Sequence, residues 1–274
     1  MTGRLDGRVV LVTGSTGIAA ATAARAASEG AAVFVVSRTD VHARLLAERL
    51  PGATWAAADL TDERAVDDAV DAAVERFGRI DAAFSAAGGS GRSFGDGPID
   101  RLTGEAWDAT VDLNLRTQVL VCSRVVRQMR AQEPDASGIR GSILLLGSVT
   151  TTAPVPELFG THAYAAAKGA LTALMMSMAA TYVDDRIRVN LLVPSLTDTP
   201  MATRAKSDPH ILEYAARKQP LAGPMLDPDE VAKAAIFFLS DESRTVTGQS
   251  LAVDGGWSIV STSTDSPSTG EPAA

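Results

Sequence analysis

The sequence predicts an α/β fold in which a doubly wound parallel sheet of seven strands carries helices on both faces. Short β-rich runs alternate along the chain with longer alanine-rich stretches of helical character, which is typical of parallel strands joined by crossover helices. Most of the strand segments are nearly continuous apolar runs, as expected for strands that are covered on both faces. No shift in composition marks a boundary before Val260, so we expect one domain over residues 1–260.

Each expected strand is a short apolar or β-branched run. In chain order the strands are Arg8–Val12, Ala32–Val36, Thr54–Ala56, Ile80–Phe84, Ser142–Leu146, Ile187–Leu192 and Ser250–Val253. Longer stretches that fill the gaps are predicted as helices: Ile18–Ser28, Asp40–Leu50, Asp62–Phe77, Glu105–Arg130, Thr161–Val183 and Pro228–Leu239. Residues 261–274 are too polar to offset the entropy of ordering, and we expect a disordered tail there.

Composition narrows the classes of function. The chain has 274 residues, of which 46% are hydrophobic, and 25 basic against 33 acidic side chains give a net charge of −8. The acidic balance argues against nucleic acid as a partner. The chain contains no apolar stretch long enough to span a membrane and no secretory leader, so we expect a cytoplasmic protein. Cys122 lies among apolar neighbours and is predicted to be a buried thiol, and the three histidines show no metal-binding spacing.

The first strand runs into a glycine turn, Thr13-Gly14-Ser15-Thr16-Gly17-Ile18, and then into a helix. Glycines let the backbone approach an anion, and the N–H groups at a helix N-terminus attract it. The segment therefore indicates a dinucleotide site, although two glycines in such a turn can also serve only the turn itself.

The residues after strands two and three bear on the choice of dinucleotide. Ser37 and Arg38 follow strand two, where a carboxylate would accept from the 2′-hydroxyl of NAD and a cation suits the 2′-phosphate of NADP. We therefore expect NADP, with NAD as the alternative; Arg38 could also be a solvated residue. Asp59 and Leu60 follow strand three, and the Asp59 carboxylate could accept from an adenine amino group or satisfy N–H groups of its own loop.

Tyr164 and Lys168 are the candidates for proton transfer. They are four residues apart on a predicted helix, where an ammonium can lower the pKa of a phenol toward neutrality and make it a general acid or base. Tyr214 and Lys218 have the same spacing. Only Tyr164 follows a strand that ends beside a polar residue, Ser148, and ligands bind at this carboxyl edge of a parallel sheet. We therefore expect Tyr214 to pack in a flap helix and Lys218 to lie in solvent.

From Arg8 to Trp257 the sequence resembles the classical branch of the short-chain dehydrogenase/reductase family. The matching features are the glycine turn, Asp59, Asn114, Ser148, Tyr164-Ala165-Ala166-Ala167-Lys168, Arg188-Val189-Asn190, Thr247-Gly248-Gln249 and Asp254-Gly255-Gly256. The resemblance implies a Rossmann-type sheet and hydride transfer between a nicotinamide cofactor and a secondary alcohol or ketone. It also implies that Tyr164 exchanges the proton, Lys168 binds the nicotinamide ribose, Ser148 holds the substrate oxygen and Asn114 holds a relay water.

The same resemblance extends the cofactor site. It places Ser85, Gly88, Pro194, Thr197 and Thr199 along the cofactor, together with the glycine turn. Three departures from the family pattern predict altered cofactor affinity and pose. Only Ser15 and Thr16 separate the first two glycines, Ser85-Ala86-Ala87-Gly88 replaces the usual Asn-Asn-Ala-Gly, and Ser195 follows Pro194 where glycine is usual.

Two other functions fit parts of the sequence. The altered turn is compatible with a dinucleotide-binding module that has no activity, and its two-residue gap resembles the extended branch of the family, whose members often modify nucleotide sugars. Substrate specificity is expected to come from three loops, 88–98, 149–160 and 196–223, with Phe94, Leu158, Phe159, Met201 and Met225 as possible pocket residues. We expect a dimer or tetramer built on the helices that begin at Glu105 and Thr161.

Overall fold

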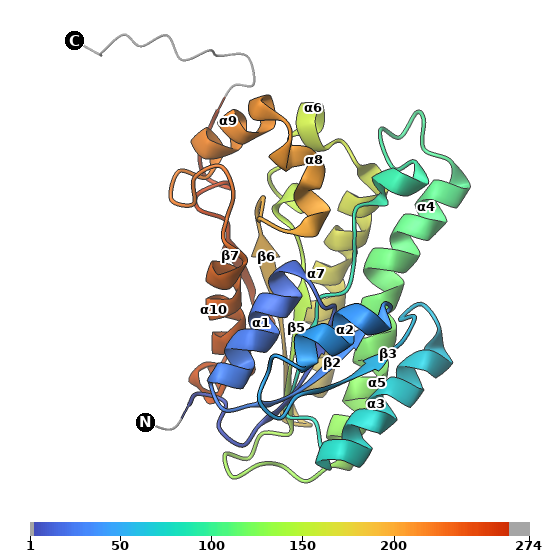
Figure 1. Ribbon diagram of the computed structural model, residues 1–274, viewed down its shortest axis with the longest axis vertical. Helices are drawn as coiled ribbons and strands as arrows, with labels where there is room; N and C mark the ends of the chain where they lie inside the picture. Colours follow the sequence, from blue (N-terminus) through green and yellow to red (C-terminus); the bar gives the residue numbers. More distant parts are fainter. Residues whose placement is uncertain (1–2, 263–274) are drawn as a thin grey trace, which may run out of the picture.

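The computed structural model describes residues 3–262 and contains one parallel sheet with strand order β3-β2-β1-β4-β5-β6-β7 (Figure 1). The strands are β1 Val9–Thr13, β2 Ala32–Ser37, β3 Thr54–Ala57, β4 Ala82–Ser85, β5 Gly141–Leu146, β6 Ile187–Pro194 and β7 Ser250–Val253. All seven predicted strands are present. The strand order reverses between β1 and β4, and this switch point opens a crevice at the carboxyl ends of the strands.

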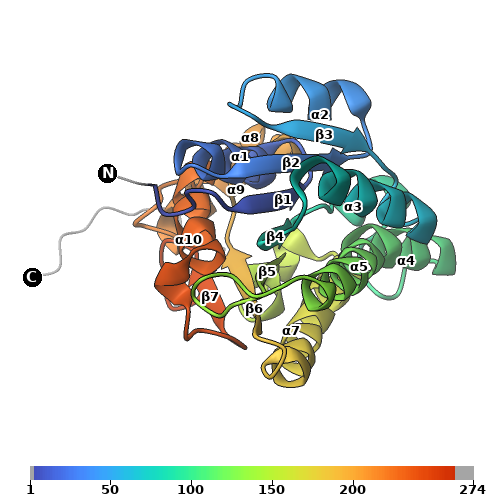
Figure 2. The ribbon, with the colours of Figure 1, turned by 90° about the horizontal axis from the view of Figure 1, so that it is seen from below.

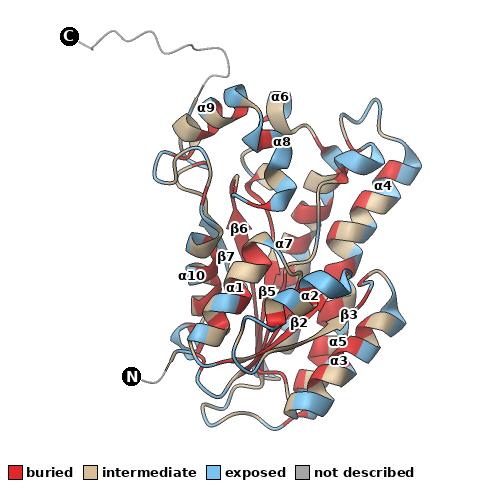
Figure 3. Ribbon diagram, in the orientation of Figure 1, coloured by how far each residue is buried: buried red, intermediate tan, exposed pale blue. Residues whose placement is uncertain are grey.

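Helices cover both faces of the sheet (Figure 2). One face carries α1 Gly17–Ser28, α2 Asp40–Ala47 and α10 Pro228–Leu239, and the other carries α3 Glu63–Phe77, α5 Thr117–Ala131 and α7 His162–Tyr182. Side chains of β1 alternate between two cores: Val10 and Val12 pack with α1 and α10, whereas Leu11 packs with α5 and α7. The five inner strands are buried, the edge strands β3 and β7 are partly exposed, and the outer faces of the helices are exposed (Figure 3). The predicted two-sided sheet is confirmed.

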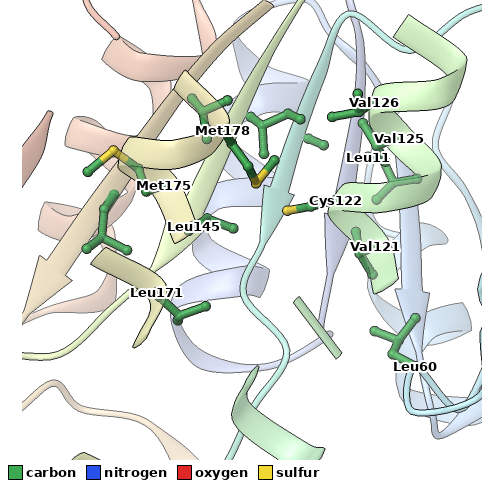
Figure 4. Close-up of a cluster of buried hydrophobic side chains, with 14 of the residues drawn as sticks. Leu11, Leu60, Val121, Cys122, Val125, Val126, Leu145, Leu171, Met175 and Met178 are labelled. Atoms are coloured by element: carbon green, nitrogen blue, oxygen red, sulfur yellow. The ribbon is translucent and has the colours of Figure 1, made fainter. Parts of the chain in front are cut away.

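Cys122 lies in the core between α5 and the sheet, beside Val121 and Val125 (Figure 4). The side chain is 2% exposed, and burial raises the pKa of its thiol to about 12. The prediction of a buried thiol is confirmed.

The prediction of one continuous helix over Glu105–Arg130 is wrong. The chain forms α4 Gly104–Val111, then a π-helical turn over Asp112–Arg116, and then α5. The turn holds the buried Asn114, whose side chain bonds outside its own helix. An extra residue in one helical turn is a common way to aim a functional side chain.

The segments above the carboxyl edge of the sheet are short. They are η1 Gly91–Phe94, η3 Val149–Thr151, α6 Pro156–Phe159, η4 Pro200–Ala202, α8 Thr203–Lys206 and α9 Pro209–Lys218, and η5 Asp241–Ser243 lies at the other end of α10. The α9 helix is the predicted flap helix, and Tyr214 is buried edge-on against Trp257 as expected. Lys218 is not free in solvent: it is half-buried and its Nζ donates to the carbonyl oxygen of Val260.

Among residues 3–262, no helix has the length and apolar character needed to cross a bilayer. The predicted tail, 261–274, lies almost entirely outside the described residues.

Candidate active site

A cavity of about 470 Å³ opens at the carboxyl edge of the sheet, next to the switch point. The four residues predicted to carry the chemistry, Asn114, Ser148, Tyr164 and Lys168, all line it. They come from the π-helical turn, the end of β5 and two consecutive turns of α7. The fold therefore brings together residues that are up to 54 positions apart in the sequence.

Ser148 lies two residues beyond β5 and is 8% exposed. Its hydroxyl accepts from the Thr150 N–H at 3.3 Å and lies 3.0 Å from the Thr150 hydroxyl, so it caps the short turn η3. A side-chain hydrogen bond also links Ser148 to Tyr164. Ser148 is thus a strand-end turn residue and a neighbour of the phenol at the same time.

The pKa of Tyr164 is raised above its ordinary value of 10. Burial is the larger cause because it disfavours the phenolate, and the hydrogen bond with Ser148 offsets it only in part. We expected Lys168 to lower the pKa of Tyr164, but in the chain without a bound cofactor the pKa of Tyr164 is raised instead. Tyr164 is a neutral phenol with a proton to donate.

Lys168 is 3% exposed, and its Nζ donates to the carbonyl oxygen of Leu146 at 2.8 Å. The same nitrogen lies 5.8 Å from the centre of the Tyr164 ring. Burial lowers the pKa of Lys168 to about 7, because desolvation disfavours the ammonium. The lysine is held beside the phenol but is close to half-protonated near neutral pH.

Asn114 is fully buried, and the segment after β4 fixes its side chain. Its Nδ2 donates to the carbonyl oxygens of Gly89 and Thr110 at 2.9 and 3.0 Å, and its Oδ1 accepts from the Gly89 N–H at 3.1 Å. A Cβ on Gly88 would lie 2.8 Å from this Oδ1, so glycine is needed there. The Asn114 side chain therefore clamps the Gly88-Gly89 segment to the floor of the cavity.

Asp96 is a residue of the site that the sequence did not reveal. Asp96 is 5% exposed, and its carboxylate accepts hydrogen bonds from the backbone N–H groups of Ala163 and Tyr164 at 3.0 and 2.9 Å. Helix α7 has no cap from its own Thr161, so Asp96 caps it from a distant loop. This contact fixes the first turn of the helix that carries Tyr164.

A second cavity, of about 510 Å³, adjoins the first and is lined by the predicted glycine turn, Gly14-Ser15-Thr16-Gly17-Ile18. Gly14 and Gly17 have φ values of +98° and +54°, which favour glycine. No side chain caps α1 at Thr16, and its first turn contains no acidic residue. The uncapped N–H groups of this helix start and the cavity beside them fit a dinucleotide pyrophosphate.

The far end of the second cavity is lined by Ser37, Arg38, Asp59 and Leu60. Arg38 is exposed, and its charge contributes to lowering the pKa of Asp59. The larger cause is that Asp59 accepts from the N–H and hydroxyl of Thr61 at 3.0 and 2.7 Å. Asp59 thus satisfies its own loop, as the simpler interpretation expected, and still faces the cavity.

Most of the remaining predicted cofactor residues also lie at the cavities. Gly88, Pro194, Thr197 and Thr199 line them. Ser195 lines the first, and its buried hydroxyl has no hydrogen-bond partner within residues 3–262. Ser85 lies inside β4, 1% exposed and paired with the neighbouring strands, and it lines neither cavity, so its role at the cofactor stays a prediction.

All three predicted specificity loops contribute to the wall of the first cavity. Phe159 and Met201 line it, and Phe94 lines the second cavity. Leu158 and Met225 line neither cavity, so these two of the five possible pocket residues lie outside both. The sequence missed further wall residues, Arg92, Arg204 and Trp257, because no local pattern marks them.

Comparisons with known proteins show the family of the chain. A family model described as Enoyl-(Acyl carrier protein) reductase matches residues 12–258. Short-chain dehydrogenase reductase 5 of Arabidopsis thaliana is 35% identical over 94% of this chain and 96% of its own length. D-threitol dehydrogenase of Mycolicibacterium smegmatis is 33% identical over 93% of this chain and 95% of its own length.

A solved structure shares the same fold. The 3-ketoacyl-(acyl-carrier-protein) reductase from Brucella melitensis, complexed with NADH, superposes with a TM-score of 0.81 at 30% identity, over 93% of this chain and all of that chain. Fold and sequence similarity agree along almost the whole chain. The protein belongs to the short-chain dehydrogenase/reductase family and is an oxidoreductase.

Proposed function

We propose that the protein transfers hydride between a nicotinamide cofactor and a secondary alcohol or ketone, with Tyr164 as general acid and base. The observation that carries the proposal is the convergence of Tyr164, Ser148, Lys168 and Asn114 on one cavity. That cavity shares wall residues, including Ile18 and Gly88, with the cavity of the glycine turn. The two spaces are therefore contiguous, as a dinucleotide with its reactive ring beside a substrate requires.

The bound nicotinamide would supply or accept the hydride, and the residues of the chain handle the proton. In the reducing direction, the raised pKa of Tyr164 keeps the phenol protonated, so it can donate to the substrate oxygen. Ser148 is placed to hold that oxygen through its hydroxyl. In the oxidising direction Tyr164 must accept a proton, and a positive charge on Lys168 assists by favouring the phenolate. Because the phenolate form of Tyr164 is the base, oxidation is expected to quicken as pH rises toward its raised pKa, and loss of the Lys168 charge above pH about 7 opposes part of this rise.

The relatives support this class of reaction. D-threitol dehydrogenase is named for a polyol, and the structural relative is named for a ketone substrate and holds NADH. Both reactions interconvert a hydroxyl and a carbonyl group.

Within this function we propose NADP as the preferred cofactor, with NAD as the weaker one. The support is Arg38, an exposed cation at the far end of the cofactor cavity, where an adenosine 2′-phosphate would lie. Arg38→Gln is expected to raise KM for NADPH about tenfold or more while changing KM for NADH little. A variant with unchanged preference would remove the basis for NADP.

The decisive experiment is Tyr164→Phe, assayed against a panel of secondary alcohols and ketones with both cofactors. Loss of the phenolic proton is expected to lower kcat by about 10²–10⁴-fold while dinucleotide binding, measured by fluorescence titration, persists. If the wild-type chain binds the dinucleotide but turns over no member of the panel, the non-catalytic binding module gains. If neither cofactor binds, the proposal fails altogether.

We also propose that the chain forms a dimer or tetramer through α4, α5 and α7. The support is the exposure of large apolar side chains on these helices, Trp107 at 39%, Val119 at 37% and Met176 at 59%. Light scattering on a gel-filtration column tests it, and a monomer of wild-type chain at micromolar concentration would contradict it.

A further inference from the structure

Two arginines share the wall of the catalytic cavity with Ser148 and Tyr164. Arg92 lies on η1, the short turn after β4, and Arg204 lies on α8 in the flap after β6. Both residues are exposed overall, although the Arg92 guanidinium is partly desolvated, so they form part of the rim of the cavity rather than its floor. Their elements are distant in sequence, and only the tertiary structure brings them together.

The two guanidinium groups lie side by side around one oxygen atom. The carbonyl oxygen of Leu158, in α6, accepts from Nη2 of Arg92 at 3.3 Å and from Nη2 of Arg204 at 2.7 Å. The Arg204 guanidinium also lies 5.8 Å from the centre of the Phe159 ring. Figure 1 shows α6 and α8 close together at the end of the molecule above the sheet.

No carboxylate neutralises this pair. Within residues 3–262, none of the ion pairs involves Arg92 or Arg204, although the chain as a whole is acidic with a net charge of −8. The nearest acidic influence on Arg92 is Asp96, whose oxygens are already used by the backbone of α7. Partial burial and the charge of Arg204 lower the pKa of Arg92. Two adjacent cations repel each other, and an anion between them would remove that cost.

We propose that Arg92 and Arg204 form a subsite for a carboxylate of the substrate, so that the enzyme acts on hydroxy acids and keto acids. The inference rests on the proposed oxidoreductase function and names the substrate class of that same cavity. A guanidinium has five N–H donors in a planar fork, and one hydrogen bond to Leu158 leaves most of them for a ligand. Leu196, Val149 and Trp257 give the cavity apolar walls for a carbon skeleton between the acid and the reacting carbon.

The test uses matched pairs of ketones that differ only in charge. Probes are 4-oxopentanoate, 5-oxohexanoate and 4-oxocyclohexanecarboxylate, each against its methyl ester, with dihydroxyacetone phosphate as an alternative anion. For the best pair, wild-type kcat/KM is expected to be at least about tenfold higher for the acid than for the ester. Arg92→Gln and Arg204→Gln should each bring this acid-to-ester ratio close to one, through KM for the acid, and Arg204→Lys should restore part of it.

Arg64→Gln is the matched control, since it removes one exposed positive charge on α3 that lines neither cavity. It should keep the wild-type ratio. The proposal is overturned if the wild type turns over acids and esters equally well, or if it prefers only the phosphate compound. It is also overturned if both arginine variants keep the wild-type acid-to-ester ratio, because the two arginines would then serve only to hold the loops together.

A binding measurement separates this proposal from the proposed function. Titration of the acids into Tyr164→Phe loaded with NADPH, followed by nicotinamide fluorescence, reports the subsite without turnover. Acid binding that weakens about tenfold in the Arg92→Gln background supports the subsite even if no ketone is reduced. Absence of acid binding in a chain that reduces neutral ketones overturns the subsite and leaves the oxidoreductase function intact.

Discussion

At the scale of single residues, Lys168 couples stability to pH. Its pKa is about 7 in the folded chain and 10.5 in the ordinary state, so between these values the unfolded chain binds more protons than the folded chain. The free energy of unfolding must therefore rise with pH across this window, by up to about 1.4 kcal/mol per pH unit, and the full penalty applies below pH 7. Lys168→Met should lack this rise. Urea unfolding of both chains from pH 7 to 9.5 measures it, and parallel curves would contradict the buried ammonium.

Gly17 is a second residue with a sharp prediction. A Cβ there would lie 2.7 Å from Cγ2 of Thr199, at a φ of +54°. Gly17→Ala should therefore displace the wall of the cofactor cavity and raise the Kd for dinucleotide about tenfold or more. Gly52→Ala is the control, because its φ is +70° but nothing lies within 4 Å of the new Cβ. Equal affinity in the two variants would show that the contact with Thr199 does not govern dinucleotide binding.

At the scale of elements, Asp96 joins the loop after β4 to the first turn of α7. Asp96→Ala removes the acceptor for the Ala163 and Tyr164 N–H groups and should cost about 0.5–2 kcal/mol of stability. Because the same turn carries Tyr164, kcat should also fall, about tenfold, and Asp96→Asn should restore part of it. Asp62→Ala removes an equivalent cap from α3, which carries no site residue, and should lower stability only. Normal kcat in Asp96→Ala would refute the positioning role.

At the scale of the whole molecule, Arg8 ties distant segments together at the amino edge of the sheet. From the start of β1 it pairs with Asp135 in the loop before β5, with Asp241 after α10 at 2.6 Å, and with Asp81 before β4 at 3.8 Å. Burial raises the pKa of Asp135, but hydrogen bonds from Ser137 and Arg8 outweigh it and the pKa falls to about 2. This carboxylate therefore contributes stability above its ordinary pKa of 3.8 that is lost as pH falls toward 2.

Arg8→Met should lower the free energy of unfolding at pH 7 by about 1–3 kcal/mol. The variant should also lose less stability than the wild type when the pH is lowered, because Asp135 then titrates closer to its ordinary pKa. kcat/KM should stay at the wild-type value, since the site is at the opposite edge of the sheet. Arg44→Met, which removes an exposed pair with Glu48 on α2, should change stability by less than about 0.5 kcal/mol. Similar losses in the two variants would contradict a special role for the Arg8 network.

The sequence alone determined the seven strands, the glycine turn and the pairing of Tyr164 with Lys168. Buried parallel strands are local apolar runs, and residues four apart on a helix share a face, so both can be read from neighbouring letters. Only the tertiary structure decided the π-helical turn at Asn114, the capping of α7 by Asp96, and the meeting of Arg92 and Arg204 on one carbonyl oxygen. Each of these features depends on hydrogen bonds between segments that are far apart in the chain. A buried backbone N–H or C=O group needs a hydrogen-bond partner, and the tertiary fold decides which distant segment supplies it.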